Sequence, residues 1–281
     1  MSKILITGYK GFIGTALCKQ LDELNFKWVG YDLKDGNDTR NKYQVDQYFQ
    51  FHSPTKVIHL AARAGVRTGQ EFPEEFITTN IIGTQNLIEC SKKYNIEHFI
   101  FFSSSSVYGN LKSPNKEESI QPLGIYGATK ATGEMLLKSS ELLHTIIRPF
   151  TVYGENGRLD QVIYKWITQI KNNLPITFYG DGTTKRGYTY VEDLVRGVIK
   201  IMVEKKQGTF NLGGNQIISL QNLLDLFLKI KSTVKVKQCP LPKGDISENW
   251  ADISKAKQEL NWIPQSDFNK KTLSIIQKEL L

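Results

Sequence analysis

Short apolar segments alternate with longer segments of helical periodicity through the first half of the chain. The short apolar runs predict buried strands at residues 4–6, 28–31, 57–60, 98–103 and 145–147. Apolar positions at helical spacing predict helices at residues 12–24, 74–93 and 126–142. Buried strands separated by helices are typical of a parallel sheet that is covered on both faces, and right-handed crossovers then produce a doubly wound topology.

The pattern changes after Arg148-Pro149, where short strands and turns rich in Gly and Pro become more frequent. Helices are predicted here at residues 161–172, 191–204 and 220–230. We therefore predict an α/β chain with a Rossmann-type, doubly wound parallel sheet over residues 1–150. Residues 151–281 are predicted to form a smaller C-terminal α/β part that binds the substrate, with residues 191–212 returning to the main sheet.

A glycine-rich turn follows the first predicted strand and opens the first predicted helix. Gly8 permits a tight turn, Gly11 lets the backbone approach a pyrophosphate, and Gly14 lets helix and strand pack closely. The start of the helix presents free N–H groups and a positive dipole end to the phosphates. We predict that this turn, including Phe12 and Ile13, binds a dinucleotide cofactor.

The carboxylate of Asp32 favours NAD as that cofactor. Asp32 ends the second predicted strand, 18 residues after Gly14. A carboxylate at this point accepts hydrogen bonds from the adenosine ribose and repels the 2′-phosphate of NADP. Lys34 weakens this preference, and capping of a turn is the alternative role for Asp32.

Three side chains further along the chain form a candidate catalytic set. Tyr126 and Lys130 lie four residues apart on a predicted helix, so they share one face. A tyrosine has an ordinary pKa of about 10, and a neighbouring ammonium lowers it, which would let Tyr126 take a proton from a substrate hydroxyl during hydride transfer. Ser104 follows the fourth strand, where open α/β sheets bind ligands, and would orient that hydroxyl.

This order of motifs resembles the extended short-chain dehydrogenase/reductase family, and within it the nucleotide-sugar epimerases and dehydratases. The similarity runs from Thr7-Gly8 to Asn261-Trp262. The resemblance implies that Ser104, Tyr126 and Lys130 are the catalytic residues. It also implies further cofactor-binding residues, namely Leu33, Asp38, Thr39, Leu60, Ala61, Ala62, Asn80, Tyr126, Lys130 and Pro149.

Two positions narrow the reaction within that family. The 4,6-dehydratases and the decarboxylases that form UDP-xylose carry acid–base carboxylates where this chain has Ser105 and Ser106. A serine hydroxyl cannot act as a carboxylate acid or base, so elimination of water and decarboxylation are disfavoured. Epimerisation and simple ketoreduction remain as the possible reactions.

Residues 59–67 and 148–158 resemble UDP-glucuronate 4-epimerases. In those enzymes, the residues that match Ser105, Thr151 and Arg158 surround the sugar carboxylate, and a guanidinium fork pairs well with a carboxylate. A phosphate or surface contact is the alternative role for Arg158.

One departure from the family lies between Gly154 and Gly157. The usual Pro-Trp pair is replaced there by Glu155-Asn156, which is expected to bring an extra carboxylate close to Arg158.

Downstream segments resemble the region of this family that binds the nucleotide. The resemblance implies that Tyr179 stacks on uracil, that Arg186 pairs with the diphosphate, and that residues 242–245 close over the nucleotide. The full predicted substrate-binding set is Ser105, Ser106, Thr151, Arg158, Tyr179, Arg186, Lys243 and Asp245.

Composition and charge change this picture little. The 281-residue chain carries a formal net charge of +8, but its lysines are scattered, so we expect small anionic ligands rather than nucleic acid. No apolar run approaches the roughly 18 residues of a membrane span, and the first strand begins too close to Met1 for a secretory signal. The three cysteines lack a Cys-x-x-Cys pair, which indicates free thiols and a cytoplasmic protein.

The leading hypothesis is NAD-dependent 4-epimerisation of a UDP-sugar through a transient 4-keto sugar, with UDP-glucuronate ahead of UDP-glucose and the N-acetyl forms. The first alternative is a nucleotide-sugar ketoreductase or dehydrogenase. The second is a non-catalytic NAD- or RNA-binding relative, although the intact Ser104, Tyr126 and Lys130 set argues against it. By analogy with relatives, we expect a homodimer, and we predict no metal site.

Overall fold

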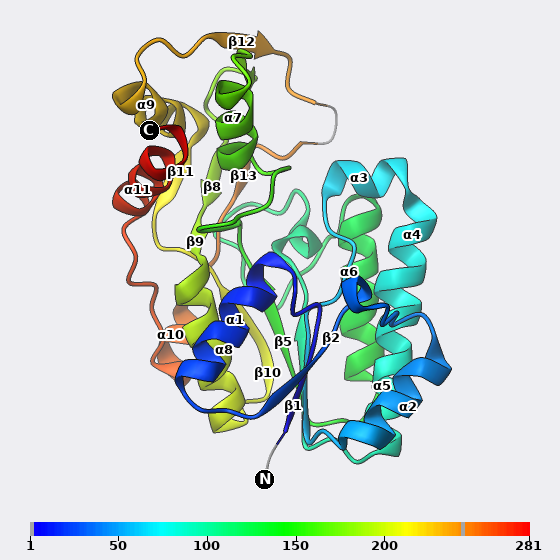
Figure 1. Cartoon of the computed structure of the whole chain (residues 1–281). Helices are drawn as coiled ribbons and strands as arrows, with labels where there is room; N and C mark the ends of the chain where they lie inside the picture. The colour runs from blue at the N-terminus through cyan, green and yellow to red at the C-terminus, as the bar shows by residue number, and fades with distance from the viewer. Residues whose placement is uncertain (1–2, 243–244) are drawn as a thin grey trace.

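A six-stranded parallel sheet forms the centre of the fold in the computed structural model, which describes residues 3–242 and 245–281 (Figure 1). The strand order is β10-β5-β4-β3-β1-β2. These strands are β1 (Ile4–Thr7), β2 (Trp28–Tyr31), β3 (Lys56–His59), β4 (His98–Phe102), β5 (His144–Pro149) and β10 (Gly208–Leu212). The predicted doubly wound α/β fold is confirmed, and the strand after the helix at residues 191–204 pairs with β5 in this sheet.

Helices cover both faces of the sheet because each strand is apolar on both sides. One face packs against α1 (Phe12–Glu23), α8 (Val191–Glu204) and α10 (Ser254–Leu260). The other packs against α2 (Lys42–His52), α5 (Gly83–Lys93) and α6 (Gly124–Lys138). None of the helices described combines the length and the apolar character needed to cross a membrane.

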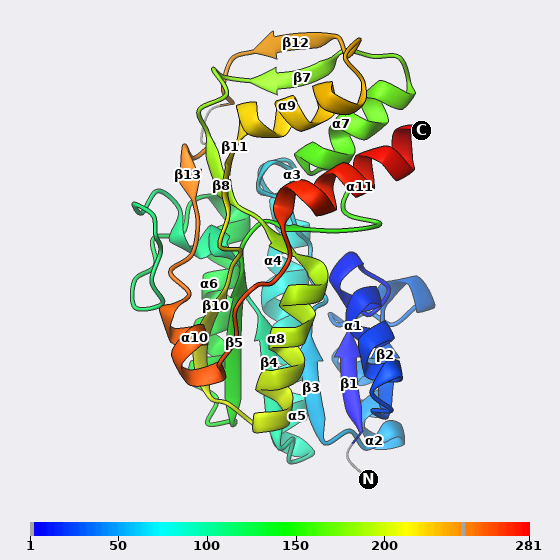
Figure 2. The same ribbon diagram turned by 90° about the vertical axis from the view of Figure 1, so that its left-hand side faces the viewer.

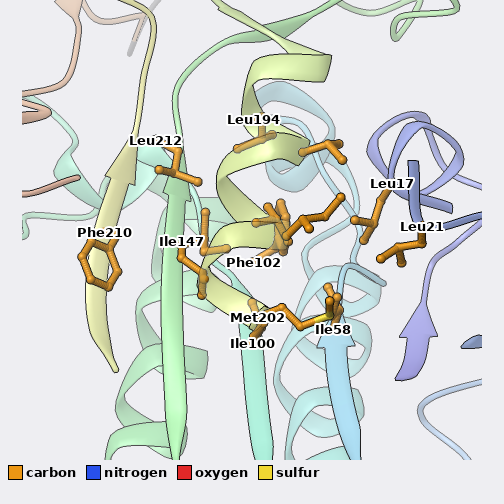
Figure 3. Packing of buried hydrophobic residues seen from close by; sticks show 14 of the residues in the cluster. Leu17, Leu21, Ile58, Ile100, Phe102, Ile147, Leu194, Met202, Phe210 and Leu212 are labelled. Atoms are coloured by element: carbon orange, nitrogen blue, oxygen red, sulfur yellow. The ribbon is translucent and has the colours of Figure 1, made fainter. Parts of the chain in front are cut away.

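Helix α8 shows why the second half of the chain contributes to the main sheet. Its apolar residues recur at helical spacing and place Leu194 and Met202 in the core. There they meet Leu17 of α1 and Phe102 of β4, together with residues of β3, β5 and β10 (Figure 3). The chain therefore has to return to the first sheet in order to complete its core.

Two predicted helices differ from the structure in their bounds. The single helix predicted at residues 74–93 consists of α4 (Pro73–Ile77), a π-helical turn η2 (Thr78–Ile82) and α5, preceded by a separate α3 (Val66–Glu71). The helix predicted at residues 126–142 begins at Gly124 and ends at Lys138. Hydroxyls of Ser139 and Ser140 donate to carbonyls of its last turn, which competes with further helical bonding.

The remaining C-terminal segments build a second apolar core. Trp166 and Phe227 pack at its centre, and the helices around them lie above the main sheet in Figure 2. The helices are α7 (Val162–Lys171), α9 (Leu220–Ile230) and α11 (Phe268–Leu280). The strands are β6 (Val152–Tyr153), β7 (Ile176–Tyr179), β8 (Lys185–Gly187), β9 (Thr189–Tyr190), β11 (Ile217–Ser219), β12 (Val236–Cys239) and β13 (Glu248–Asn249).

The order of the main sheet reverses between β1 and β3. Strand β2 lies on one side of β1, whereas β3, β4, β5 and β10 follow on the other side. Doubly wound sheets bind ligands in the crevice outside the carboxyl ends of the strands at such a reversal. The short 3-10 turns η1 (Leu33–Asp35) and η3 (Ser105–Tyr108) follow β2 and β4 at this same edge.

Candidate active site

A cleft of about 480 Å³ opens at the carboxyl ends of the central strands. It joins the glycine-rich turn after β1 to the serine run after β4 and to the first turns of α6. The predicted site residues that line it are Gly8, Gly11, Phe12, Ile13, Gly14, Leu60, Ala62, Ser104, Ser105, Ser106, Tyr126, Lys130, Pro149, Thr151 and Arg158. Residues from five separate predicted motifs therefore meet in one place.

The glycine-rich turn has no room for side chains. Gly8 has a φ of 71°, and a Cβ on it would lie 2.7 Å from the amide nitrogen of Ala61. A Cβ on Gly14 would lie 2.4 Å from the carbonyl oxygen of Gly8. Gly11 is the N-cap of α1 and no side chain caps that end, so the first N–H groups of the helix stay available to a phosphate. These residues fit the pyrophosphate of a dinucleotide.

The predicted adenosine end of the cofactor site is a second cleft of about 250 Å³ beside the glycine turn. Asp32 lines it and caps a turn, which is the alternative role that the sequence left open, while its bond to the ribose stays a prediction. One carboxylate oxygen accepts the N–H of Lys34 at 2.9 Å and so caps η1, and the other accepts the N–H of Lys10 at 2.9 Å. Each carboxylate oxygen keeps acceptor capacity for a ribose hydroxyl. Predicted residues that share this cleft are Gly8, Gly11, Leu33, Asp38, Thr39, Leu60, Ala61 and Ala62.

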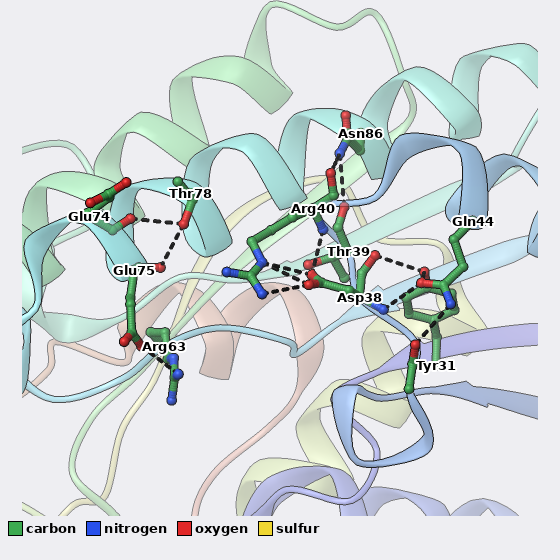
Figure 4. Close-up of polar contacts among 11 residues, drawn as sticks. Tyr31, Asp38, Thr39, Arg40, Gln44, Arg63, Glu74, Glu75, Thr78 and Asn86 are labelled. Carbon is green, nitrogen blue, oxygen red and sulfur yellow. Dashed lines mark hydrogen bonds and ion pairs between the residues drawn. The ribbon is translucent and has the colours of Figure 1, made fainter.

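The far wall of the adenosine cleft is held by polar contacts (Figure 4). The carboxylate of Asp38 forms a bidentate pair with Arg40, with a shortest separation of 2.6 Å. The side-chain amide of Asn86 on α5 donates to the carbonyls of Thr39 and Arg40. The guanidinium of Arg63, which also lines the cleft, pairs with Glu75 at 2.5 Å. The wall is therefore fixed before a ligand binds.

Asn80 is the predicted cofactor residue that lines neither of these two clefts. It is buried in the π-helical turn, where its side chain accepts the N–H of Arg63 at 2.8 Å and donates to the Arg63 carbonyl and the Thr129 hydroxyl, each at 3.0 Å. Asn80 thus ties the loop after β3 to α6. This contact agrees with the support of the active-site helix that the family resemblance implies for Asn80, and contact of Asn80 with the cofactor stays a prediction.

Tyr126 stands in the cleft with its pKa raised above the ordinary value, chiefly because it is buried. A hydrogen bond with the Ser104 side chain and the charge of Arg158 lower that pKa, and the charge of Asp160 raises it. The Ser104 hydroxyl also donates to the Ser106 hydroxyl at 3.1 Å and accepts the Ser106 N–H at 3.1 Å. Ser104 and Tyr126 therefore lie in the same cleft, where both could act on one substrate hydroxyl.

Lys130 is buried one helical turn after Tyr126, and its ammonium nitrogen donates to the carbonyl oxygen of Phe102 at 2.7 Å. Burial lowers the pKa of Lys130 to about 7, and the charge of Glu134 opposes that shift. The charge of Arg158 also lowers the pKa of Tyr126. The expected action of Lys130 on Tyr126 stays a prediction.

A buried ion pair between β5 and α6 holds the helix that carries Tyr126 and Lys130. Arg148 at the end of β5 binds both carboxylate oxygens of Glu134, at 2.8 and 2.6 Å. Glu134 also accepts the hydroxyl of Ser103 at 2.5 Å, and Arg148 donates to the hydroxyl of Tyr108 at 2.9 Å. Sequence reasoning missed this network, although Glu134 lies at helical spacing from Lys130 and Tyr126.

A smaller cleft of about 190 Å³ continues from the main one toward the C-terminal part. Thr151, at a φ of 21°, lines both clefts. The predicted nucleotide contacts Tyr179, Arg186 and Asp245 line the smaller one, as does Arg67, which was not predicted. Lys243 lies outside the described residues.

Arg67 belongs to α3 and reaches across to the C-terminal part. Its guanidinium lies 4.8 Å from the ring centroid of Tyr179 and donates to Asp245 at 2.8 Å. The Lys165 ammonium lies 5.0 Å from the same ring. A base that stacks on Tyr179, as predicted for uracil, therefore shares that ring with two cations, which also suit a nearby diphosphate.

The carboxylate beside Arg158 is Asp160, and not Glu155 as the sequence suggested. Both nitrogens of the Arg158 fork donate to Asp160, at 2.9 and 2.6 Å, and both residues line the main cleft. The carboxylate of Glu155 pairs instead with Lys278 of α11 at 2.8 Å. This pair could have been predicted from the sequence, because Asp160 lies only two residues after Arg158.

A dinucleotide cradle, an adjoining nucleotide-sized cleft and a Ser-Tyr-Lys set between them define an enzyme of the short-chain dehydrogenase/reductase class. Residues 4–213 match the NAD dependent epimerase/dehydratase family. The chain belongs to that family, which confirms both the predicted resemblance and NAD as the cofactor.

Curated relatives match the chain over almost its whole length. The UDP-glucuronate 4-epimerase of Thermodesulfobacterium geofontis is 35% identical, with 94% of this chain and 92% of the relative covered. Protein CapI of Staphylococcus aureus is 30% identical, with 94% of each chain covered.

Solved structures agree with these relatives. The UDP-glucuronic acid 4-epimerase of Bacillus cereus, in complex with UDP-glucuronic acid and NAD, has a TM-score of 0.90 at 32% identity and covers 98% of this chain and 99% of its own. The UDP-glucose 4-epimerase of Thermotoga maritima, with UDP-glucose, has a TM-score of 0.90 at 28% identity and covers 98% and 97%.

The first prediction concerns the adenosine end. In Asp32→Ala, the affinity for NAD falls about ten- to hundred-fold, because hydrogen bonds to a charged group contribute about 1.5–3 kcal/mol. Titration calorimetry with NAD measures this, and circular dichroism shows whether the turn that Asp32 caps survives. The control is Asp35→Ala, since Asp35 binds Tyr9 and Lys10 and lies outside the cleft lining. Unchanged NAD affinity in Asp32→Ala would contradict the assigned role.

The second prediction concerns the charge of Lys130. Above about pH 7 the folded protein holds Lys130 neutral, whereas the unfolded chain keeps its proton up to the ordinary pKa of 10.5. The unfolded state binds more protons in this interval, so rising pH favours the folded state. Between about pH 7 and about pH 10, the cofactor-free wild type should therefore gain roughly 2–4 kcal/mol of unfolding free energy relative to Lys130→Met.

Denaturant unfolding of both proteins across that interval measures the difference. Lys93→Met is the control, because the pKa of Lys93 is raised by Asp46 and its proton stays bound throughout. A constant difference between the wild type and Lys130→Met would show that Lys130 has an ordinary pKa.

Proposed function

We propose that the protein inverts the configuration at C4 of a UDP-linked sugar, with UDP-glucuronate as the foremost candidate, through a transient 4-keto sugar and with NAD retained. The observation that carries this proposal is the position of Tyr126 and Ser104 at the junction between the dinucleotide cradle and the smaller cleft at Thr151. The activities named for the relatives from T. geofontis and B. cereus support the same choice.

The chain divides the work of the reaction among few residues. NAD, held by the glycine turn, would supply the hydride chemistry at C4 of the sugar. Tyr126 would remove the proton of the 4-hydroxyl, and Ser104, which lines the same cleft, would orient that hydroxyl. The pKa of Tyr126 is raised by burial, so Tyr126 becomes a base only when opposing charges act on it. Lys130 lines the same cleft and would hold the ribose next to the reacting end of the cofactor.

The residues at the sugar end favour epimerisation over elimination. Ser105 and Ser106 line the cleft beside Ser104, and neither supplies a carboxylate for loss of water. Ser105, Thr151 and Arg158 offer two hydroxyls and a guanidinium to the C5 substituent of the sugar. Tyr179, Arg186 and Asp245 would hold the uridine and the diphosphate in the smaller cleft.

The third prediction tests the reaction itself. With one equivalent of NAD, the wild type interconverts UDP-glucuronate and its C4 epimer without accumulating reduced nicotinamide. In Tyr126→Phe, kcat falls by about 10²–10⁴, which is the usual contribution of general acid–base catalysis, while binding of UDP changes little. Chromatographic separation of the two epimers measures the rate.

The matched control is Tyr43→Phe, which removes an exposed hydroxyl on α2 that lines neither ligand cleft. Steady, stoichiometric consumption of reduced nicotinamide with a keto-sugar would replace the epimerase with a ketoreductase. No turnover of UDP-glucuronate, UDP-glucose or their N-acetyl analogues would remove the proposed activity altogether.

A homodimer through α4, η2 and α6 is part of this proposal. These neighbouring segments expose large apolar side chains in a monomer, at Ile77, Ile82 and Met135. The fourth prediction is that Ile82→Glu converts a dimer to a monomer, since a charge in an apolar interface is strongly unfavourable. Light scattering measures the mass. The control is Val203→Glu, at an exposed position on α8. A monomeric wild type would contradict it.

We further propose a cytoplasmic enzyme that does not bind nucleic acid. Cys18, Cys90 and Cys239 form no disulfide, as expected in a reducing compartment. Two of the basic side chains, Arg67 and Arg186, line the cleft proposed for the anionic nucleotide.

A further inference from the structure

The guanidinium of Arg158 already uses its Nε–Nη2 edge to bind a carboxylate of the same chain. Its Nε donates to one oxygen of Asp160 at 2.9 Å and its Nη2 to the other at 2.6 Å, which is the bidentate geometry that a sugar carboxylate would need. The pair stands at the sugar end of the cleft, where both residues contribute to the lining together with Tyr126 and Thr151. A ligand carboxylate that binds this edge of Arg158 therefore competes with Asp160.

Asp160 is free to leave this position. Its side chain is 51% exposed and that of Arg158 33% exposed, so the pair lies at the edge of the cleft and not in the core. The hydrogen bonds given for Asp160 within the described part of the chain are those from Arg158. An exposed ion pair of this kind contributes little to stability, so a ligand carboxylate can compete with it.

We propose that Asp160 determines the sugar specificity by competing with the substrate for Arg158. A neutral hexose binds while Asp160 stays paired with Arg158, whereas a hexuronic acid binds only after its carboxylate has replaced that of Asp160. This inference rests on the proposed binding of UDP-sugars. It makes the selectivity between the two sugar classes a property of one exposed side chain.

The electrostatics around Tyr126 agree with this exchange. Arg158 and Asp160 act on Tyr126 in opposite directions, and Asp160 opposes the phenolate. When a uronate displaces Asp160, one carboxylate takes the place of another beside Arg158. One guanidinium and one carboxylate then act on the pKa of Tyr126 whether the sugar is charged or neutral. Both classes of sugar can therefore be turned over.

The fifth prediction uses Asp160→Asn in the NAD-loaded protein, with UDP-glucuronate, UDP-glucose and UDP as ligands in titration calorimetry. Removal of the competing carboxylate strengthens binding of UDP-glucuronate about three- to ten-fold, because both the exposed ion pair and the like-charge contact are gone. The affinity for UDP-glucose stays the same or falls, since Arg158 is left without its partner, and the affinity for UDP is unchanged.

Two further variants separate specificity from general charge. Asp160→Glu keeps the carboxylate and should keep the wild-type ratio of the two affinities. Asp225→Asn makes the same change in net charge on α9, away from both ligand clefts, and should change neither affinity. If the ratio of the affinities for UDP-glucuronate and UDP-glucose is unchanged in Asp160→Asn, the proposed role of Asp160 is wrong, while the proposed function still stands. Failure of either UDP-sugar to bind the wild type more tightly than UDP would overturn the proposed function as well.

Discussion

The buried pair between Arg148 and Glu134 is the interaction on which the geometry of the active site depends. Both side chains are almost fully enclosed, so loss of either partner would leave an uncompensated charge inside, at a cost of about 3–5 kcal/mol. Glu134 also accepts from Ser103, the residue before Ser104. Because Lys130 lies one turn earlier on α6, this single pair fixes the serine run, the end of β5 and the catalytic face of the helix relative to one another.

Around Tyr126, burial and charge act against each other. The enclosed position and Asp160 hold the phenol protonated, while Arg158 and the Ser104 hydroxyl favour its ionisation. Lys130 is buried as well, and burial lowers its pKa to about 7, so it loses its proton near neutrality. The basicity of the tyrosine is therefore set by the ligands that enter the cleft, which keeps the reactive group idle while the cleft is empty.

The repeating elements could be predicted from the sequence because their signals are local. Apolar periodicity located the strands and helices. The glycines at residues 8–14 predict a tight phosphate-binding turn from their spacing alone. The candidate catalytic residues Ser104, Tyr126 and Lys130 were chosen from their order along those elements, and they line one cleft. The bounds that failed, at residues 78–82 and after Lys138, depend on side chains that bond to the backbone, and no hydrophobic pattern records such bonds.

Loop residues were harder to predict for the same reason. Glu155 was expected near Arg158 because it is close in sequence, yet its partner Lys278 is 123 residues away. Asp160 was overlooked although it lies two residues from Arg158. Arg67 on α3 was overlooked because its partners Tyr179 and Asp245 are far away in the sequence.

The smaller cleft has one last consequence for the molecule as a whole. Arg67 comes from the part built on the large sheet, whereas Tyr179 and Arg186 come from the part with its own apolar core. A nucleotide held among them bridges the two parts of the molecule. Its binding energy therefore adds to the cohesion between the two halves, and the substrate becomes a structural component of the enzyme for as long as it stays bound.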